Sequence, residues 1–178
     1  TFILLPENSP PLIALIDTGV DFNHPDLITN AYINPGETIN GIDDDNNGYI
    51  DDISGFNFVG YYETETGTYQ NQDTSGHGTH EAGLITGVPH SPTGIRGINT
   101  TAKILNVRIF DDNRRANQLD AAIAIRYAVD SGAKIINCSW GFFKYNTVLK
   151  EAIEYAIANE CLVFAAVGNT NTNLKEYP

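Results

Sequence analysis

Segments with the pattern of buried strands alternate with segments of helical spacing, and this constrains the fold more than any other feature. The strand candidates are residues 12–16, 103–110, 135–139 and 162–167, and the helix candidates are 117–130 and 146–157. Continuous apolar runs of this length are typical of strands buried on both faces of a parallel sheet. The alternation predicts an α/β fold with a mainly parallel sheet and helices on both faces.

The composition is that of a globular chain with one core. The chain has 178 residues, of which 42% are hydrophobic and 18% charged, a length that fits one domain. The net charge of −12 argues against a nucleic-acid partner, and no apolar run is long enough for a membrane span. Cys138 and Cys161 lie in apolar segments and are expected to be buried and free. Because the chain contains no Met, we expect Thr1 to arise by processing or excision.

Polar side chains follow three of the strand candidates at the point where each strand ends. Asp17 closes the first, Ser139 closes the third, and Asn169 follows the fourth. A buried carboxylate is costly unless it is hydrogen-bonded or functional. Because the carboxyl ends of parallel strands share one edge of a sheet, we expect these side chains to lie close together.

A histidine-containing stretch, residues 75–83, has the sequence Ser-Gly-His-Gly-Thr-His-Glu-Ala-Gly. The glycines beside His77 leave room for a substrate backbone, and Ser75 or Thr74 can cap the helix that follows. A surface histidine is the alternative, and a zinc pair of His77 with His80 fits less well because their spacing is i,i+3. An Asp, a His and an Asn amide are the parts of acyl-transfer chemistry: orienting group, general base and oxyanion donor.

An acidic loop lies within residues 34–60 and carries five carboxylates between Asp43 and Asp52. Its spacing matches the first nine positions of an EF-hand-like calcium loop. The predicted Ca²⁺ ligands are the side chains or, for tyrosine, the carbonyl of Asp43, Asp45, Asn47, Tyr49 and Asp51. Ser54 occupies the twelfth position instead of Glu, so the remaining ligand comes from elsewhere, with Asp52 as a candidate. The alternative is a solvated acidic loop.

Four segments, in this order along the chain, resemble motifs of the subtilisin-like serine proteases. They are residues 16–20 with 24–27, residues 77–83, residues 135–141 and residues 165–169. The resemblance implies that Asp17 orients the catalytic imidazole, that His77 is the general base and that Asn169 donates to the oxyanion. It further implies that Asp26 and the loop 88–95 bind a second Ca²⁺. The implied substrate-binding residues are Ser139, Trp140, Gly141, Ala166 and Gly168.

The sequence departs from the family pattern at the nucleophile and after the second histidine, among other places. The serine motif Gly-Thr-Ser-x-Ala is absent between Thr1 and Pro178, so the fold is expected to be incomplete at its carboxyl end. Glu81 replaces the small apolar residue that usually follows the second histidine. Residues 1–178 are therefore interpreted as the amino-terminal part of one subtilisin-like catalytic domain, with the calcium loop inserted at about 34–60.

The expected function is peptide-bond hydrolysis through an acyl-enzyme, acting on a peptide or protein substrate. The serine would come from a complementary carboxyl-terminal fragment, and this chain alone is expected to be inactive because the triad acts as a unit. Two alternatives stay open: a non-catalytic calcium-binding or interaction module, and a peptide macrocyclase or transpeptidase. Because calcium sites of this type fill at extracellular concentrations, we expect a secreted or cell-envelope protein.

Overall fold

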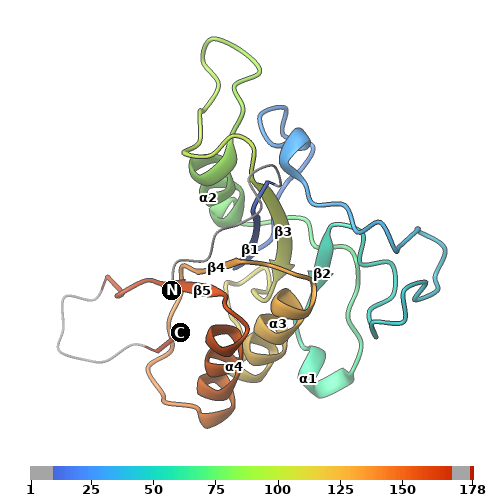
Figure 1. Ribbon diagram of the computed structural model, residues 1–178. Coiled ribbons are helices and arrows are strands. Elements are labelled where there is room, and N and C mark those ends of the chain that lie inside the picture. The colour runs from blue at the N-terminus through green and yellow to red at the C-terminus, as the bar shows by residue number, and fades with distance from the viewer. Residues whose placement is uncertain (1–9, 170–176) are drawn as a thin grey trace.

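A five-stranded parallel sheet forms the centre of the computed structural model, which describes residues 10–169 and 177–178 (Figure 1). The strand order is β2-β3-β1-β4-β5, and every pair is parallel. The strands are β1 (Leu12–Asp17), β2 (Gly55–Asn57), β3 (Lys103–Arg108), β4 (Ile135–Cys138) and β5 (Leu162–Ala165). The helices are α1 (Tyr61–Thr64), α2 (His77–Thr86), α3 (Gln118–Asp130) and α4 (Thr147–Ala158), with a 3₁₀ turn at Ile28–Asn30. The prediction of an α/β fold with a parallel sheet is confirmed.

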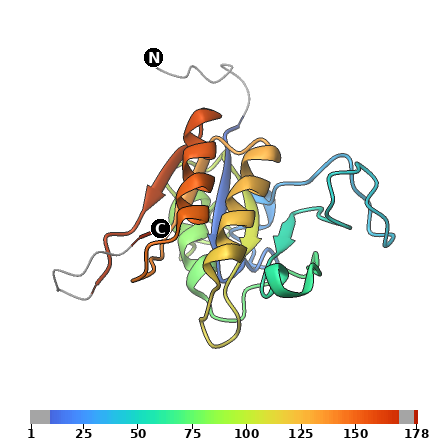
Figure 2. The same cartoon turned by 90° about the horizontal axis from the view of Figure 1, so that it is seen from below.

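Strand β1 supplies side chains to a core on each face of the sheet. Ala14 and Ile16 belong to the larger core, which includes buried residues of α3 and α4. Ile13 and Leu15 belong to a smaller core that includes Ala82 of α2. Helices α3 and α4 pack side by side on one face, and α2 covers the other (Figure 2). Since alternate side chains of a strand point to opposite faces, this arrangement explains why the whole run is apolar.

Asparagine side chains cap the two long helices. The Asn117 side chain accepts a hydrogen bond from the Leu119 amide at the start of α3. The Asn146 side chain accepts hydrogen bonds from two amides in the first turn of α4. Gly132, which follows α3, adopts a φ of 88°, the left-handed conformation that favours glycine after a helix. Cys138 and Cys161 are buried and free.

Strand β2 lies inside the segment expected to be a loop. It has three residues, too few to show a periodic pattern, and its position depends on pairing with β3. Gly55 is required there, because a Cβ atom would lie 2.0 Å from the Asn106 carbonyl oxygen. Phe56 and Phe58 then pack in a cluster of aromatic rings with Tyr49, Tyr61 and Tyr127.

The outer side of the sheet at β5 exposes apolar side chains. In the described residues β5 pairs with β4 alone, and Leu162, Phe164 and Val167 are 55%, 56% and 97% exposed. Apolar side chains on an open strand edge are available for contact with another segment. None of the described helices has the length and apolar character that crossing a bilayer requires.

Candidate active site

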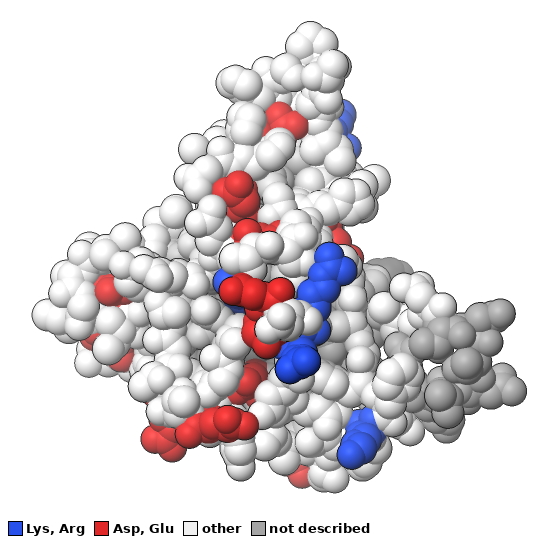
Figure 3. All heavy atoms as spheres, turned by 180° about the vertical axis from the view of Figure 1, so that it is seen from behind, with Lys and Arg blue, Asp and Glu red and all other residues white. Residues whose placement is uncertain are grey.

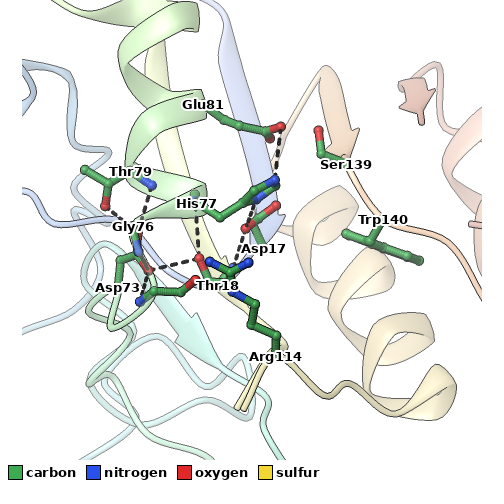
Figure 4. Close-up of polar contacts among 12 residues, drawn as sticks. Asp17, Thr18, Asp73, Gly76, His77, Thr79, Glu81, Arg114, Ser139 and Trp140 are labelled. Carbon is green, nitrogen blue, oxygen red and sulfur yellow. Dashed lines mark hydrogen bonds and ion pairs between the residues drawn. The ribbon is translucent and has the colours of Figure 1, made fainter. Parts of the chain in front are cut away.

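A cleft of about 270 Å³ opens at the carboxyl edge of the sheet, and its lining includes five of the predicted catalytic and substrate-binding residues: Asp17, His77, Ser139, Trp140 and Gly141. Asp17 is the last residue of β1, His77 is the first residue of α2, and Ser139 follows β4. The lining consists of Asp17, Thr18, His77, Phe110, Arg114, Ser139, Trp140 and Gly141. Figure 4 labels Asp17, Thr18, His77, Arg114, Ser139 and Trp140. Adjacent parallel strands therefore bring together residues that lie up to 124 positions apart, as Trp140 and Ile16 show.

The Asp17 carboxylate and the His77 imidazole form the central contact of the cleft. Asp17 Oδ1 lies 2.8 Å from His77 Nδ1 and accepts a second hydrogen bond from the Thr18 amide. Asp17 is 1% exposed, whereas the His77 side chain is 43% exposed. An Nδ1–H that donates to Asp17 leaves the Nε2 lone pair free to accept a proton. The pair can therefore act as an oriented general base.

The pKa of His77 is set by opposing effects. Burial alone would lower it, but the hydrogen bond to Asp17 and the charges of Asp17 and Glu81 raise the pKa above its ordinary value. The guanidinium of Arg114 acts in the opposite direction. The net effect is a raised pKa, so the imidazole of His77 binds a proton more readily than an isolated histidine does.

Glu81 places a second carboxylate on the other side of the imidazole. Its Oε2 accepts a hydrogen bond from Asn137 Nδ2 at 2.9 Å, and its Oε1 lies 4.0 Å from His77 Nε2. Ligating atoms of Asp17, His77 and Glu81 lie within 4.8 Å of one another. The two carboxylates face opposite ring nitrogens, whose lone pairs diverge, so one metal ion does not fit all three groups. His80 lines a different cavity together with His24, and the zinc pair of His77 with His80 has no support.

Asp73 organises the segment before His77, and the sequence analysis missed it. Its Oδ1 accepts hydrogen bonds from Thr18 Oγ1 and from the amides of Ser75 and Gly76. Its Oδ2 accepts from the amide and hydroxyl of Thr79. The predicted cap at Ser75 or Thr74 is wrong: Gly76, with a φ of 87°, precedes α2 and provides no side-chain cap. The signal in the sequence that could have indicated this role is the position of Asp73, four residues before His77.

Replacing Asp73 with Ala is expected to lower the free energy of unfolding by about 3 kcal/mol, because several donors lose their acceptor. Although burial opposes it, the hydrogen bonds from Thr79, Gly76 and Ser75 lower the pKa of Asp73. Its contribution is therefore complete above its ordinary pKa of about 3.9 and is lost as pH falls through the lower folded value. Urea unfolding at about pH 7 and at about pH 3 measures this. Asp21→Asn is the control, because the Asp21 carboxylate accepts one hydrogen bond from the described residues, that of the Asn23 amide. An equal loss at both pH values would contradict the prediction.

Trp140 forms part of the cleft wall and is fixed in place. It is 7% exposed, and its Nε1 donates a 2.7 Å hydrogen bond to the Ile16 carbonyl. Its ring packs edge-on against Phe142. The Asn137 amide donates to Ser139 Oγ, which orients the neighbouring wall residue. This wall is therefore rigid compared with a loop that lacks such bonds.

The predicted oxyanion segment lies beside the cleft and is not part of its lining. It follows β5, where the Ala166 amide donates to the Cys138 carbonyl at 3.1 Å. Gly168 adopts a φ of 82°, and Asn169 is exposed. The roles of Ala166, Gly168 and Asn169 in substrate and oxyanion binding stay predictions.

The acidic loop gathers three carboxylates, one of which the sequence analysis missed. Ligating atoms of Glu37, Asp43 and Asp45 lie within 4.8 Å of one another. Glu37 is 6% exposed, and its oxygens accept hydrogen bonds from the amides of Asp45 and Asp51. The Asp51 carboxylate instead accepts from the amides of Asn40 and Gly41. Glu37 is therefore a candidate for the acidic ligand that the loop lacks at its twelfth position, Ser54.

The other acidic candidates make protein contacts. Asp52 accepts hydrogen bonds from the Tyr127 hydroxyl, Asn34 and Asn47. The Asp26 carboxylate accepts from the amides of His90 and Ile95, which lower its pKa. Asp26 belongs to no group of three ligating side chains in the described part of the chain. The Asp26 carboxylate therefore holds the loop 88–95 through two backbone hydrogen bonds.

Comparisons with known proteins agree with this geometry. The family model described as the subtilase family matches residues 8–178. The chain is 37% identical over 145 residues to subtilisin-like protease 1 of Plasmodium berghei, covering 80% of this chain and 23% of that protein. It is 34% identical to thermitase of Thermoactinomyces vulgaris, covering 97% of this chain and 52% of thermitase. The solved structure of sphericase superposes with a TM-score of 0.72 at 28% identity, covering 93% of this chain and 48% of sphericase. The chain spans between about a quarter and a half of these relatives' lengths, and it belongs to the subtilase family.

Proposed function

We propose that residues 1–178 form the amino-terminal part of the catalytic domain of a subtilisin-like serine endopeptidase. The observation that carries this proposal is the 2.8 Å contact between buried Asp17 and His77 inside a cleft. Asp17 holds the imidazole and stabilises its cation, while His77 Nε2 takes the proton of the attacking serine hydroxyl. Asn169 supplies an amide donor to the oxyanion of the tetrahedral intermediate.

The nucleophile in this proposal comes from a complementary carboxyl-terminal segment. No serine of the chain stands in the Gly-Thr-Ser-x-Ala context. The exposed apolar edge at β5 supports a covering segment, because Leu162, Phe164 and Val167 would otherwise stay in water. The peptide backbone would lie along Ser139, Trp140 and Gly141, with Ala166 and Gly168 on the neighbouring segment.

Fluorophosphonate labelling of the complete protein, followed by a denaturing gel and intact mass, tests the proposed activity. We expect one serine to be labelled, and the label to be lost on His77→Ala. Labelling on a second polypeptide would place the serine on a partner fragment. Absence of label from a protein that contains the serine segment would contradict the proposal and favour a non-catalytic interaction module. Mass analysis of the peptide products separates hydrolysis from macrocyclisation or transpeptidation.

We also propose that the acidic loop binds Ca²⁺ through Glu37, Asp43 and Asp45. The donor set fits a hard cation, since these carboxylate oxygens gather within 4.8 Å and none of them forms an ion pair in the described residues. Asn47 and the Tyr49 carbonyl complete the proposed ligands. A site of this kind fills at extracellular calcium concentrations, which supports a secreted or cell-envelope location.

Calcium is expected to raise the melting temperature of the protein after chelation. Binding at about a hundredfold excess over Kd adds about 2.7 kcal/mol to the free energy of unfolding. Glu37→Gln is expected to abolish most of this shift. Asp44→Asn serves as the matched control. Asp44 is exposed, its carboxylate accepts hydrogen bonds from Thr38 and Asn40, and it does not belong to the group of three proposed ligands. Equal calcium shifts in both variants, measured by scanning calorimetry, would contradict the site.

A further inference from the structure

Arg114 is the one Lys or Arg side chain in the cleft lining within the described residues. It belongs to the loop between β3 and α3, and its side chain extends toward Thr18 and Asp17 (Figure 4). Its charge acts on His77, whose pKa it lowers. Arg114 therefore lies close to the groups that would act on the scissile carbonyl.

The loop holds Arg114 in a fixed conformation. Arg114 has a φ of 59°, in the left-handed region that is uncommon for a side-chain-bearing residue. The Asp111 carbonyl and carboxylate accept hydrogen bonds from the amides of Arg114 and Arg115, and the Asp111 amide donates to the Arg115 carbonyl. Arg114 Nε donates to Ser75 Oγ at 2.9 Å. The anchor uses Nε, so both Nη groups remain available to a ligand within the described part of the chain.

No carboxylate of the described residues pairs with Arg114. Nearby Arg108, by contrast, pairs with Asp112 at 2.7 Å, and Asp17 is engaged by His77. The whole chain carries a net charge of −12. The face opposite to that in Figure 1 shows acidic groups at several places and basic side chains near its centre (Figure 3). An unpaired guanidinium in the cleft of so acidic a protein presents its two Nη groups as a fork that matches a carboxylate.

We propose that Arg114 binds a carboxylate of the peptide substrate and selects peptides with Asp or Glu close to the cleaved bond. This inference rests on the proposed peptidase function. The cleft is short enough that His77 and Arg114 line the same 270 Å³ space, so the acidic residue lies near the scissile bond. Phe110 and Trp140 provide apolar walls for the methylene groups of a Glu side chain. A free carboxyl terminus offers the same chemistry as an acidic side chain.

The test uses the complete enzyme and peptides that differ only in having Glu, Gln or Lys at each position flanking the cleaved bond. These peptides are amidated at the carboxyl terminus. An additional Gln series carries a free carboxyl terminus. We expect kcat/KM for the best Glu peptide to exceed that for its Gln counterpart about tenfold, mainly through KM. In Arg114→Glu the preference is expected to reverse toward Lys. A preference confined to the free-carboxylate series would assign Arg114 to the peptide terminus and overturn selection of acidic side chains.

Two control variants separate charge recognition from damage to the loop. Arg115→Glu makes the same charge change at an exposed neighbour outside the cleft, and it is expected to keep the Glu preference. Ser75→Ala removes the anchor of Arg114 but keeps its charge, and the sign of the preference is expected to persist. Hydrolysis without any charge preference, or a preference that Arg114→Glu leaves unchanged, would overturn this inference alone. No hydrolysis of any peptide would overturn the proposed function and the inference with it.

Discussion

Asp17→Asn in the complete enzyme is expected to reduce kcat by about 10⁴-fold. Asp17 Oδ1 accepts the hydrogen bond from His77 Nδ1 at 2.8 Å, whereas Oδ2 is buried and has no hydrogen-bond partner among the described residues. An Asn amide group at the Oδ2 position would leave buried N–H groups unsatisfied. Turned toward His77, it would donate to Nδ1 and place the imidazole proton on Nε2, where the base must accept one. The second arrangement removes the oriented base, and the first removes the negative charge that stabilises the imidazole cation.

Steady-state kinetics on a neutral peptide measures this effect, with urea unfolding as a check on folding. Asp112→Asn is the matched control, because Asp112 is exposed and pairs with Arg108 outside the cleft lining. The control is expected to stay within a few-fold of the unmodified enzyme. Retention of more than about a tenth of kcat by Asp17→Asn would mean that His77 is not oriented by this carboxylate.

Gly78→Ala is expected to cost about 3 kcal/mol of stability and to separate His77 from Asp17. A Cβ atom at Gly78 would lie 2.2 Å from the Gly19 carbonyl oxygen and 3.3 Å from Asp17 Cβ. The first of these contacts is with backbone, which cannot rotate away as a side chain can. Helix α2 must therefore move from the end of β1, and the imidazole moves with it.

Gly83→Ala provides the control in the same helix. Its Cβ atom would lie 3.4 Å from Ile95 Cγ2, an ordinary packing distance. Because Ala favours helix more than Gly does, this variant is expected to be neutral or slightly stabilised. Urea unfolding and the NMR titration of His77 measure both variants. Similar stabilities for the two, or an unchanged His77 pKa in Gly78→Ala, would show that the close approach of α2 to β1 does not position the imidazole.

The parts of the fold that the sequence predicts are those fixed by local patterns. Continuous apolar runs mark β1, β3, β4 and β5, and asparagine caps mark the starts of α3 and α4. The expectation that the last of these strands is buried is wrong, because the side chains of β5 are exposed except for the half-buried Val163. The meeting of Asp17 and Ser139 follows from parallel strands alone, because neighbouring strands end at one edge. The predicted contact of His77 with this edge depended on the family resemblance, because no local sequence pattern indicates where the start of a helix lies relative to the sheet.

The residues that the sequence analysis missed act through contacts distant in the chain. Asp73 binds Thr18, which lies 55 positions earlier. Glu37 reaches the amide of Asp51, which lies 14 positions later. Strand β2 exists because β3 pairs with it. Each of these roles depends on the position of a partner that only the assembled sheet provides.

Trp140 lines the cleft, and its fluorescence can report whether the cleft is occupied. Trp140 is the chain's one tryptophan, so the intrinsic indole emission of these 178 residues comes from a single site. Its Nε1 is tied to the Ile16 carbonyl, and its ring lines the space in which a peptide would lie. Occupation of the cleft changes the solvent around the indole ring before any bond is broken. Trp140 fluorescence can therefore follow peptide binding in a catalytically inactive variant, in which binding is measured without turnover.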